Sequence, residues 1–298
     1  MPRPLPLSVA PRRPSGADEK IGPSPSHFTA TLHTLRAFGP AAAGARVVPI
    51  SAVILTKNSA RHLPEVLTAL EWCEEVLVFD TGSTDETMAI ARRWPNVQLY
   101  GLEGGFPGFG RARRQAVALA RHDWILSIDS DEVVSAELAA EIAALPLDAR
   151  IVYAMPFHNY YNGRLITSCG WHPDRHERLF NRRATNFCES ELHERVQCAD
   201  FFVRQLRHPI RHYSYGSVDD FLHKTRIYSR LFAEQHAGRR RAGPVRALAR
   251  AGWAFFKSYV LQRGCLQGAE GFVISAFQGQ LVFWKYLRLA EANRRPPA

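Results

Sequence analysis

The strongest constraint on this chain is an alternation of short apolar runs with polar, helix-like stretches between about residues 50 and 130. The apolar runs are rich in β-branched residues and predict strands that are buried on both faces. They cover residues 51–56, 75–79, 97–100 and 124–128, and the helix-like stretches between them cover residues 64–72, 83–94 and 111–121. Strands that alternate with helices predict an α/β fold, with a Rossmann-like, mostly parallel sheet flanked by helices.

The start of the second helix-like stretch carries a local signal of its own. Ser83 is followed three residues later by Glu86, which is the spacing of a capping box. In that motif, the two side chains bond to the free backbone amides at a helix N-terminus. We therefore predict that a capping box opens a helix that runs to about Trp94.

The rest of the chain divides by composition. Residues 1–46 are rich in Pro, Ala, Gly and Arg and have no sustained period, so we expect a disordered leader. We expect residues 47–215 to form the α/β domain, although aromatic-rich, strand-like segments replace the regular alternation after residue 146. Residues 216–292 have a helical, basic and aromatic pattern and predict a helical C-terminal extension, with residues 293–298 as a tail.

The positive charge lies in the last third of the chain. The net charge is +10, and the segment from Arg204 to Ala298 has seventeen Lys or Arg and five Asp or Glu. Such a surface attracts nucleic acid, an anionic membrane or an anionic substrate, or it is a solvated helical face. No run of about 18 apolar residues occurs there, which disfavours a spanning helix and leaves a helix that lies on a membrane.

Cysteine usage and the N-terminus bear on location. The five cysteines form no CxxC pair and no zinc-binding pattern with histidine, so we interpret them as reduced thiols of a cytosolic protein. The first residues, Met-Pro-Arg-Pro-Leu-Pro-Leu, have no uninterrupted apolar core of the kind that a secretory signal needs. We therefore expect a cytoplasmic protein.

Acidic residues follow two of the expected strands directly. Ligands of open parallel sheets bind beyond the carboxyl ends of the strands. Asp80 stands there in Asp80-Thr-Gly-Ser-Thr-Asp85 and could accept hydrogen bonds from a nucleobase or ribose; equally, it could only form a turn with its Ser and Thr neighbours.

The second acidic cluster is Asp129-Ser130-Asp131, after the strand at 124–128. Carboxylates at i and i+2 of an extended chain project to the same side, so both can face one hard cation such as Mg²⁺ or Mn²⁺. Such a cation would bridge a diphosphate and neutralise the charge of a leaving group. An Asp-x-Asp tripeptide alone is usually a solvated turn, but its place at a strand end favours a site.

Three segments carry a family resemblance: Ala52-Val-Ile-Leu-Thr-Lys-Asn58, Val78-Phe-Asp-Thr-Gly-Ser-Thr-Asp-Glu-Thr87 and Asp123-Trp-Ile-Leu-Ser-Ile-Asp-Ser-Asp-Glu132. They resemble the successive motifs of family-two inverting glycosyltransferases with the GT-A fold. Further segments resemble the subgroup near the lipopolysaccharide-core β-1,4-glucosyltransferases, namely Gly170-Trp-His-Pro-Asp174, Arg178-Leu-Phe180, Leu192-His-Glu194 and His212-Tyr-Ser-Tyr215. The resemblance covers roughly residues 50 to 290.

The resemblance implies roles for particular residues. It implies that Asp80 binds the base, that Asp131 is the main metal ligand and that Asp129 lies near the donor ribose or sugar. Thr56 and Asn58 would line the same nucleotide pocket. The subgroup often has Glu after its Lys-Asn pair, where this chain has Ser59, so the contacts of that carboxylate are in question.

An inverting transfer also needs a general base that deprotonates the acceptor hydroxyl, and a carboxylate can serve. Glu194 is our candidate, because the segment that contains it follows the metal triplet as it does in the family. Glu191 and Asp174 are the alternatives, and a surface salt bridge is the structural interpretation of Glu194. The glycine-rich loop Gly104–Gly110 fails the dinucleotide-binding spacing and is either a flap near the acceptor or a plain connection.

Together these patterns predict an enzyme that moves a hexose, with inversion, from a nucleotide sugar to a lipid-linked or cell-envelope glycan such as lipopolysaccharide core. The expected cofactor is divalent Mg²⁺ or Mn²⁺, and the expected location is the inner face of the plasma membrane, on an anionic surface. Two alternatives stay open. A nucleotidyltransferase would use a similar fold, and a basic protein could bind nucleic acid through the C-terminal arginines.

Overall fold

A computed structural model describes residues 47–188 and 195–294. The expected leader, residues 1–46, therefore lies outside the described residues, and of the expected tail only Asn293 and Arg294 are described.

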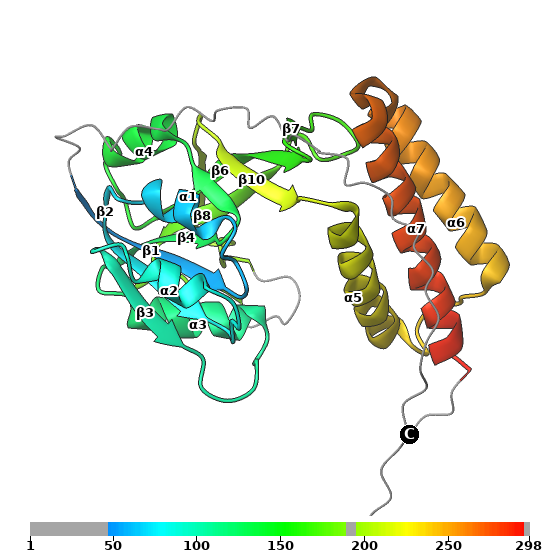
Figure 1. Ribbon diagram of the computed structural model, residues 1–298, viewed down its shortest axis with the longest axis horizontal. Coiled ribbons are helices and arrows are strands. Elements are labelled where there is room, and N and C mark those ends of the chain that lie inside the picture. Colours follow the sequence, from blue (N-terminus) through cyan, green and yellow to red (C-terminus); the bar gives the residue numbers. More distant parts are fainter. Residues whose placement is uncertain (1–46, 189–194, 295–298) are drawn as a thin grey trace, which may run out of the picture. The chain divides into compact units, whose positions relative to one another are not determined.

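Within the described ranges, ten strands form one sheet, in the order β3-β2-β1-β4-β8-β6-β10-β5, with β7 and β9 each paired to β6 (Figure 1). The strands are β1 (Val48–Thr56), β2 (Cys73–Asp80), β3 (Val97–Gly101), β4 (Trp124–Asp129), β5 (Glu132–Val134), β6 (Ile151–Tyr161), β7 (Arg164–Leu165), β8 (Arg175–Asn181), β9 (Phe202–Gln205) and β10 (Ile210–Tyr215).

Strand direction divides this sheet into two parts. The four strands predicted from the alternation, β3, β2, β1 and β4, are all parallel to their neighbours. Beyond β4 the sheet becomes mixed, because β8 runs antiparallel to both β4 and β6. The predicted α/β class with flanking helices is confirmed, and the mixed part corresponds to the aromatic-rich segments after residue 146.

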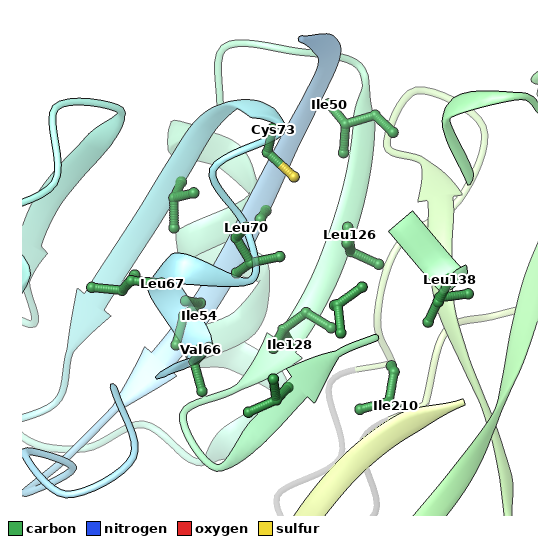
Figure 2. Close-up of a cluster of buried hydrophobic side chains, with 14 of the residues drawn as sticks. Ile50, Ile54, Val66, Leu67, Leu70, Cys73, Leu126, Ile128, Leu138 and Ile210 are labelled. Carbon is green, nitrogen blue, oxygen red and sulfur yellow. The ribbon is translucent and has the colours of Figure 1, made fainter. Parts of the chain in front are cut away.

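Buried side chains lie on both faces of the parallel strands, as continuous apolar runs require. Along β1, Ile50 and Ile54 point into the cluster under α1 (Leu63–Thr68) and α4 (Ala136–Ala143), which Figure 2 shows. Val53 and Leu55 point into a second cluster, against α3 (Phe109–Leu119). The two clusters fix the positions of β1 and β4, and therefore the positions of the loops that follow these strands.

The helix after β2 differs from the prediction. It is α2 (Thr87–Ala91), and its N-cap residue Glu86 makes no side-chain capping bond. The Ser83 hydroxyl instead donates to Asp80 over 2.5 Å, while the backbone amide of Thr87 donates to Asp85 over 3.0 Å. The predicted capping box is therefore wrong, because the Asp80 carboxylate takes the Ser83 amide and hydroxyl that the box would use.

The helical C-terminal extension is present. It consists of α5 (Val218–His236), α6 (Pro244–Phe256) and α7 (Gly268–Ala292), with a π-helical turn (Lys257–Leu261) and a short 3₁₀ turn (Gly264–Gln267) between α6 and α7. Helix α5 begins directly after β10 with a capping box formed by Ser217 and Asp220, and both α5 and α6 pack against α7. Among the described residues, no helix combines the length and the apolar character needed to cross a bilayer.

Candidate active site

A cavity of about 640 Å³ lies beyond the carboxyl ends of β1 and β4. Its volume is within the roughly 300–1,000 Å³ that small-molecule sites occupy. The lining comes from the loop after β1, Thr81 after β2, the glycine-rich loop with the start of α3, the triplet after β4, the end of β10 and the first half of α5. Of the predicted site residues, Thr56, Asn58, Asp129 and Asp131 are among the lining residues.

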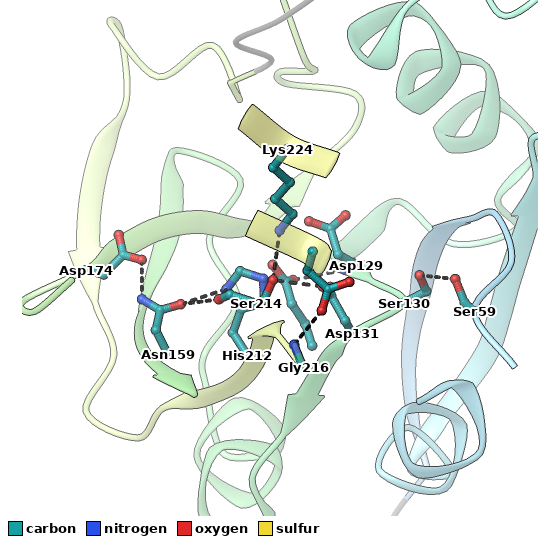
Figure 3. Close-up of polar contacts among 12 residues, drawn as sticks. Ser59, Asp129, Ser130, Asp131, Asn159, Asp174, His212, Ser214, Gly216 and Lys224 are labelled. Carbon is teal, nitrogen blue, oxygen red and sulfur yellow. Dashed lines mark hydrogen bonds and ion pairs between the residues drawn. The ribbon is translucent and has the colours of Figure 1, made fainter. Parts of the chain in front are cut away.

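Strand register brings two predicted motifs together. β1 and β4 are parallel neighbours, with Leu55 opposite Asp129, so their following loops leave the sheet side by side. The hydroxyls of Ser59 and Ser130 are 2.7 Å apart across these loops (Figure 3). Ser59 stands where the resembling subgroup often has Glu, and here it ties the β1 loop to the acidic triplet.

Asp129 is held by two arginines. Arg113 of α3, which is 3% exposed, bonds to one carboxylate oxygen, and Arg178 of β8 lies 3.2 Å from the other. Burial alone would raise the pKa of Asp129, but the two guanidinium groups lower it well below its usual range. Asp129 is therefore an anion whose two oxygens both face cations.

Glu132 completes this buried charge cluster. It is 1% exposed, bonds to Arg178 and accepts a 2.9 Å hydrogen bond from the backbone amide of Asp129. Burial raises its pKa to about 7, and the attraction of Arg178 only partly offsets that. Arg178 thus binds both Asp129 and Glu132.

Asp131 is about as exposed as Asp129, and it faces a histidine. Its Oδ2 lies 3.7 Å from Nε2 of His212, on β10. Burial lowers the pKa of His212, but the negative charges of the neighbouring carboxylates, Asp131 first among them, outweigh this, and the net effect is a raised pKa.

The other ring nitrogen of His212 is fixed by a chain of polar groups, seen in Figure 3. The amide nitrogen of Asn159 donates to Asp174 over 2.9 Å, which leaves its Oδ1 to face Nδ1 of His212 at 2.8 Å. Because that oxygen can only accept, Nδ1 keeps its proton in the neutral ring, and the proton that the neighbouring carboxylates favour is the one on Nε2, whose loss frees a lone pair there. This is the arrangement by which proteins orient a metal-binding histidine.

The loop after β1 supplies two polar groups. The Thr56 hydroxyl is buried, lines the cavity and has no hydrogen-bond partner among the described residues. Asn58 has a positive φ of 52°, and its side-chain oxygen accepts from the backbone amide of Thr84 over 2.8 Å. Asn58 thus fastens the β1 loop to the loop after β2.

Asp80 is placed differently from the other predicted residues. It is 8% exposed, does not line the cavity, and its carboxylate accepts hydrogen bonds from the amides of Gly82 and Ser83 and from the Ser83 hydroxyl. This is the turn-forming arrangement that the sequence left open. A nucleobase that bound to this carboxylate would have to compete with Gly82 and Ser83 of the same loop.

Sequence reasoning missed several lining residues. No role was assigned to His212, to Lys224 and Tyr228 of α5, or to Phe106 and Phe109 of the glycine-rich loop. Lys224 donates to the backbone oxygen of Ser214 over 2.8 Å, and its ammonium lies 4.1 Å from the centre of the Tyr215 ring. Burial lowers its pKa. Two signals in the sequence point to these residues: the His212–Tyr215 motif, and the glycine-rich loop, for which a flap is one of the two interpretations.

The candidate bases are resolved only in part. Glu194 and Glu191 lie outside the described residues. Asp174 does not line the cavity, and its oxygens contact Asn159 and, at 2.9 Å, His176.

Trp171 stacks on Tyr215 with 5.4 Å between ring centres, inside an apolar cluster at α5 and α7.

Comparison with known proteins gives the family. Residues 51–208 match Glycosyl transferase family 2. An uncharacterised glycosyltransferase of Rickettsia felis is 29% identical over 260 residues, which are 81% of this chain and 88% of the relative. The lipopolysaccharide core biosynthesis glycosyltransferase LpsC of Rhizobium meliloti is 26% identical over 197 residues, 63% of this chain and 72% of LpsC.

Among solved structures, residues 1–349 of TarS from S. aureus, in complex with UDP, align with a TM-score of 0.43 and 16% identity, over 83% of this chain and 91% of that one. The family match spans more than half of the chain and contains both acidic motifs and the strands that position them. This protein is therefore a glycosyltransferase and belongs to glycosyl transferase family 2.

Proposed function

We propose that this glycosyltransferase moves a hexose, with inversion, from a nucleotide sugar, in the first place a UDP-sugar, to a lipid-linked or cell-envelope glycan such as lipopolysaccharide core. The observation that carries the proposal is the pairing of Asp131 with His212 in the cavity, beside the buried ammonium of Lys224. An oxygen and a nitrogen ligand next to a cation are suited to a divalent metal and the diphosphate it accompanies.

The donor would occupy the cavity between the β1 loop and the acidic triplet. Thr56 offers an unpartnered hydroxyl to a polar ligand, and Asn58 would line the same pocket. Asp129 is assigned to the ribose or sugar side, where its two arginines keep it charged and fixed. Base binding by Asp80 remains a proposal, and it requires Asp80 to give up hydrogen bonds within its own loop.

The groups present fit a divalent metal, although the described residues contain no cluster of three or more protein ligands. Asp131 and Nε2 of His212 would hold it, with the remaining positions left to phosphate oxygens and water, as Mg²⁺ and Mn²⁺ commonly accept. When bound, the metal would neutralise the charge that develops on the leaving diphosphate. Lys224 would add a positive charge on the same side of the cavity.

Direct displacement needs an acceptor hydroxyl that loses its proton as it attacks. We assign this role to Glu194, on the family resemblance of its segment and the chemistry of a carboxylate. The contacts of Asp174 with Asn159 and His176 suit it better to orienting His212 than to serving as a base.

The acceptor and the location rest on weaker support, namely the similarity to LpsC and the basic, aromatic C-terminal region. We propose that the enzyme works at the cytoplasmic face of the plasma membrane, on its anionic surface. We also propose residues 47–215 as the catalytic domain and residues 216–292 as a helical region that completes its pocket through Lys224 and Tyr228.

A thermal-shift panel of nucleoside diphosphates and nucleotide sugars, with and without Mn²⁺, tests the proposal. We expect UDP and Mn²⁺ together to raise the melting temperature. Asp131→Asn should remove the part of this rise that depends on Mn²⁺ and lower turnover by orders of magnitude. The melting temperature without metal should not change in this variant. Asp200→Asn, an exposed acid away from the cavity, is the matched control. Full activity in excess chelator would contradict the metal role, and retention on nucleic acid without nucleotide-sugar binding would favour the alternative.

A further inference from the structure

Helix α6 exposes an apolar face to solvent. Val245, Leu248, Trp253 and Phe256 are 82, 68, 57 and 44% exposed. The last three lie 3, 8 and 11 residues after Val245, close to one, two and three helical turns, so the four side chains share one side of the helix. The opposite side carries Ala247, which is buried, and packs on α7. The exposed apolar face is therefore not used in the fold of the described residues.

Basic residues border this apolar face. Arg246 and Lys257 directly follow Val245 and Phe256, and Arg250 lies one turn after Arg246, so the three share the adjoining side. All three are exposed, and the Arg250 guanidinium also lies 5.6 Å from the centre of the Tyr286 ring on α7. From residue 235 to residue 269 the sequence has seven Lys or Arg and no Asp or Glu. The surface around α6 is thus apolar in the middle and purely cationic at its margin.

Two other occupants fit this surface less well. A second copy of the chain in a symmetric contact would bring two cationic margins together, and like charges at an interface cost free energy. Insertion across a bilayer is not supported, since no described helix meets the requirements for spanning. Headgroups of an anionic bilayer supply the missing negative charge, and the acyl boundary accepts Leu, Phe and Trp side chains.

We propose that α6 lies in the plane of an anionic membrane surface, with Val245, Leu248, Trp253 and Phe256 below the headgroups and Arg246, Arg250 and Lys257 among them. This arrangement follows the physics of interfacial helices, in which apolar burial and attraction to anionic lipid add up. The inference deepens the proposed function by identifying the surface that holds the enzyme near a lipid-linked acceptor, and it rests on that function for its purpose.

The test is flotation of the full chain with vesicles of phosphatidylcholine, alone or mixed with phosphatidylglycerol. We expect recovery only with the anionic vesicles, and a decrease with added salt. The pair Arg246→Ala and Lys257→Ala should lower partitioning about 25-fold, about five-fold for each basic residue. The pair Leu248→Glu and Phe256→Glu should lower it by at least about ten-fold for each side chain kept out of the bilayer.

Matched controls change the same chemistry elsewhere. Arg92→Ala with Arg93→Ala removes two exposed charges from the region of α2, and Phe202→Glu places an acid at a 76% exposed apolar position on β9. Both should float like the unchanged protein. Equal effects of control and α6 variants would overturn the inference, as would equal recovery with both vesicle types.

A further measurement separates the remaining outcomes. If sedimentation shows a dimer that Leu248→Glu with Phe256→Glu converts to a monomer, and the unchanged protein does not float, the occupant is a second copy and the inference is wrong. The response of the melting temperature to UDP and Mn²⁺ should be the same in all α6 variants. If the unchanged protein shows no such response, the proposed function is contradicted, but the flotation result for α6 still holds.

Discussion

At the scale of single residues, the metal role proposed for His212 predicts a dependence of metal binding on pH. Asp131 holds the pKa of the ring above 6.5, although burial opposes this. The ion pair therefore stabilises the metal-free protein fully below a pH of about 6.5 and loses that contribution as the pH rises through the raised folded-state pKa. A metal takes only the neutral ring, so Mn²⁺ should raise the melting temperature more at a pH of about 8.5 than at about 6.

His212→Gln is the variant that checks this. It should flatten the pH dependence of the metal-free melting temperature over that window and reduce the Mn²⁺ response at the higher pH. Asn159→Ala, which leaves Nδ1 only the Ser214 hydroxyl at 3.0 Å, should weaken the Mn²⁺ response less, by about 10-fold to 100-fold in affinity. An Mn²⁺ response in the unchanged protein that is equal at both pH values would contradict the assignment of His212.

Glu194 is the residue on which the proposed inverting mechanism depends. Donor binding involves other groups, so Glu194→Gln should leave nucleotide-sugar affinity nearly unchanged and lower transfer about 10²-fold to 10⁴-fold, the usual contribution of a general base. A purely structural salt bridge would instead lower the melting temperature and leave specific activity largely intact. Wild-type transfer by Glu194→Gln, together with loss in Glu191→Gln or Asp174→Asn, would move the role to that residue.

At the scale of elements, local patterns and long-range contacts differ in how well the sequence predicts them. The alternation of strands and helices and the acids at the ends of β2 and β4 could be predicted, because buried strands and strand-end loops leave a mark within a few residues. His212 and Lys224 could not, since β10 and α5 come more than 80 residues after the triplet that they face. The sequence likewise permits Ser83 either to cap the following helix or to bond to Asp80, and only the structure shows that it bonds to Asp80.

Helix α7 offers a test of close packing. A Cβ added at Gly271 would lie 1.9 Å from the backbone oxygen of Gly264, which cannot move without displacing the 3₁₀ turn. Gly271→Ala should therefore cost about 1–3 kcal/mol or more, as overpacked cores do. Gly252 on α6 meets no atom within 4 Å, so Gly252→Ala should stabilise by up to about 1 kcal/mol through helix propensity.

Thermal unfolding of these two variants in solution measures the difference directly. In a domain of this size, a change of 1 kcal/mol moves the melting temperature by about 2–4 °C, so the two shifts should be resolved and opposite in sign. A Gly271→Ala protein as stable as the unchanged one would mean that α7 and the 3₁₀ turn do not approach as closely as described.

At the scale of the whole molecule, the cavity joins the α/β part to the helical part, because Lys224 and Tyr228 of α5 line it together with the loops after β1 and β4. Apart from the cavity, α5 is attached to the sheet through its connection to β10 and through the apolar cluster that contains Tyr161, Phe221 and Ile274. A ligand that contacts both the loops after β1 and β4 and helix α5 should therefore stabilise both parts of the protein against unfolding. This is a property of the site and does not depend on which sugar is transferred.

Hydrogen exchange with UDP and Mn²⁺ tests this coupling. At a ligand concentration of about 100 times Kd, binding adds about 2.7 kcal/mol, so amides whose opening breaks the site should exchange about 100-fold more slowly. We expect such protection in residues 56–62 and 129–131 and also in the first half of α5. Lys224→Met should keep the protection of the two loops at saturating ligand and reduce that of α5, because the ammonium no longer reaches the ligand. Protection confined to the loops in the unchanged protein would mean that α5 packs beside the donor site without contributing to it.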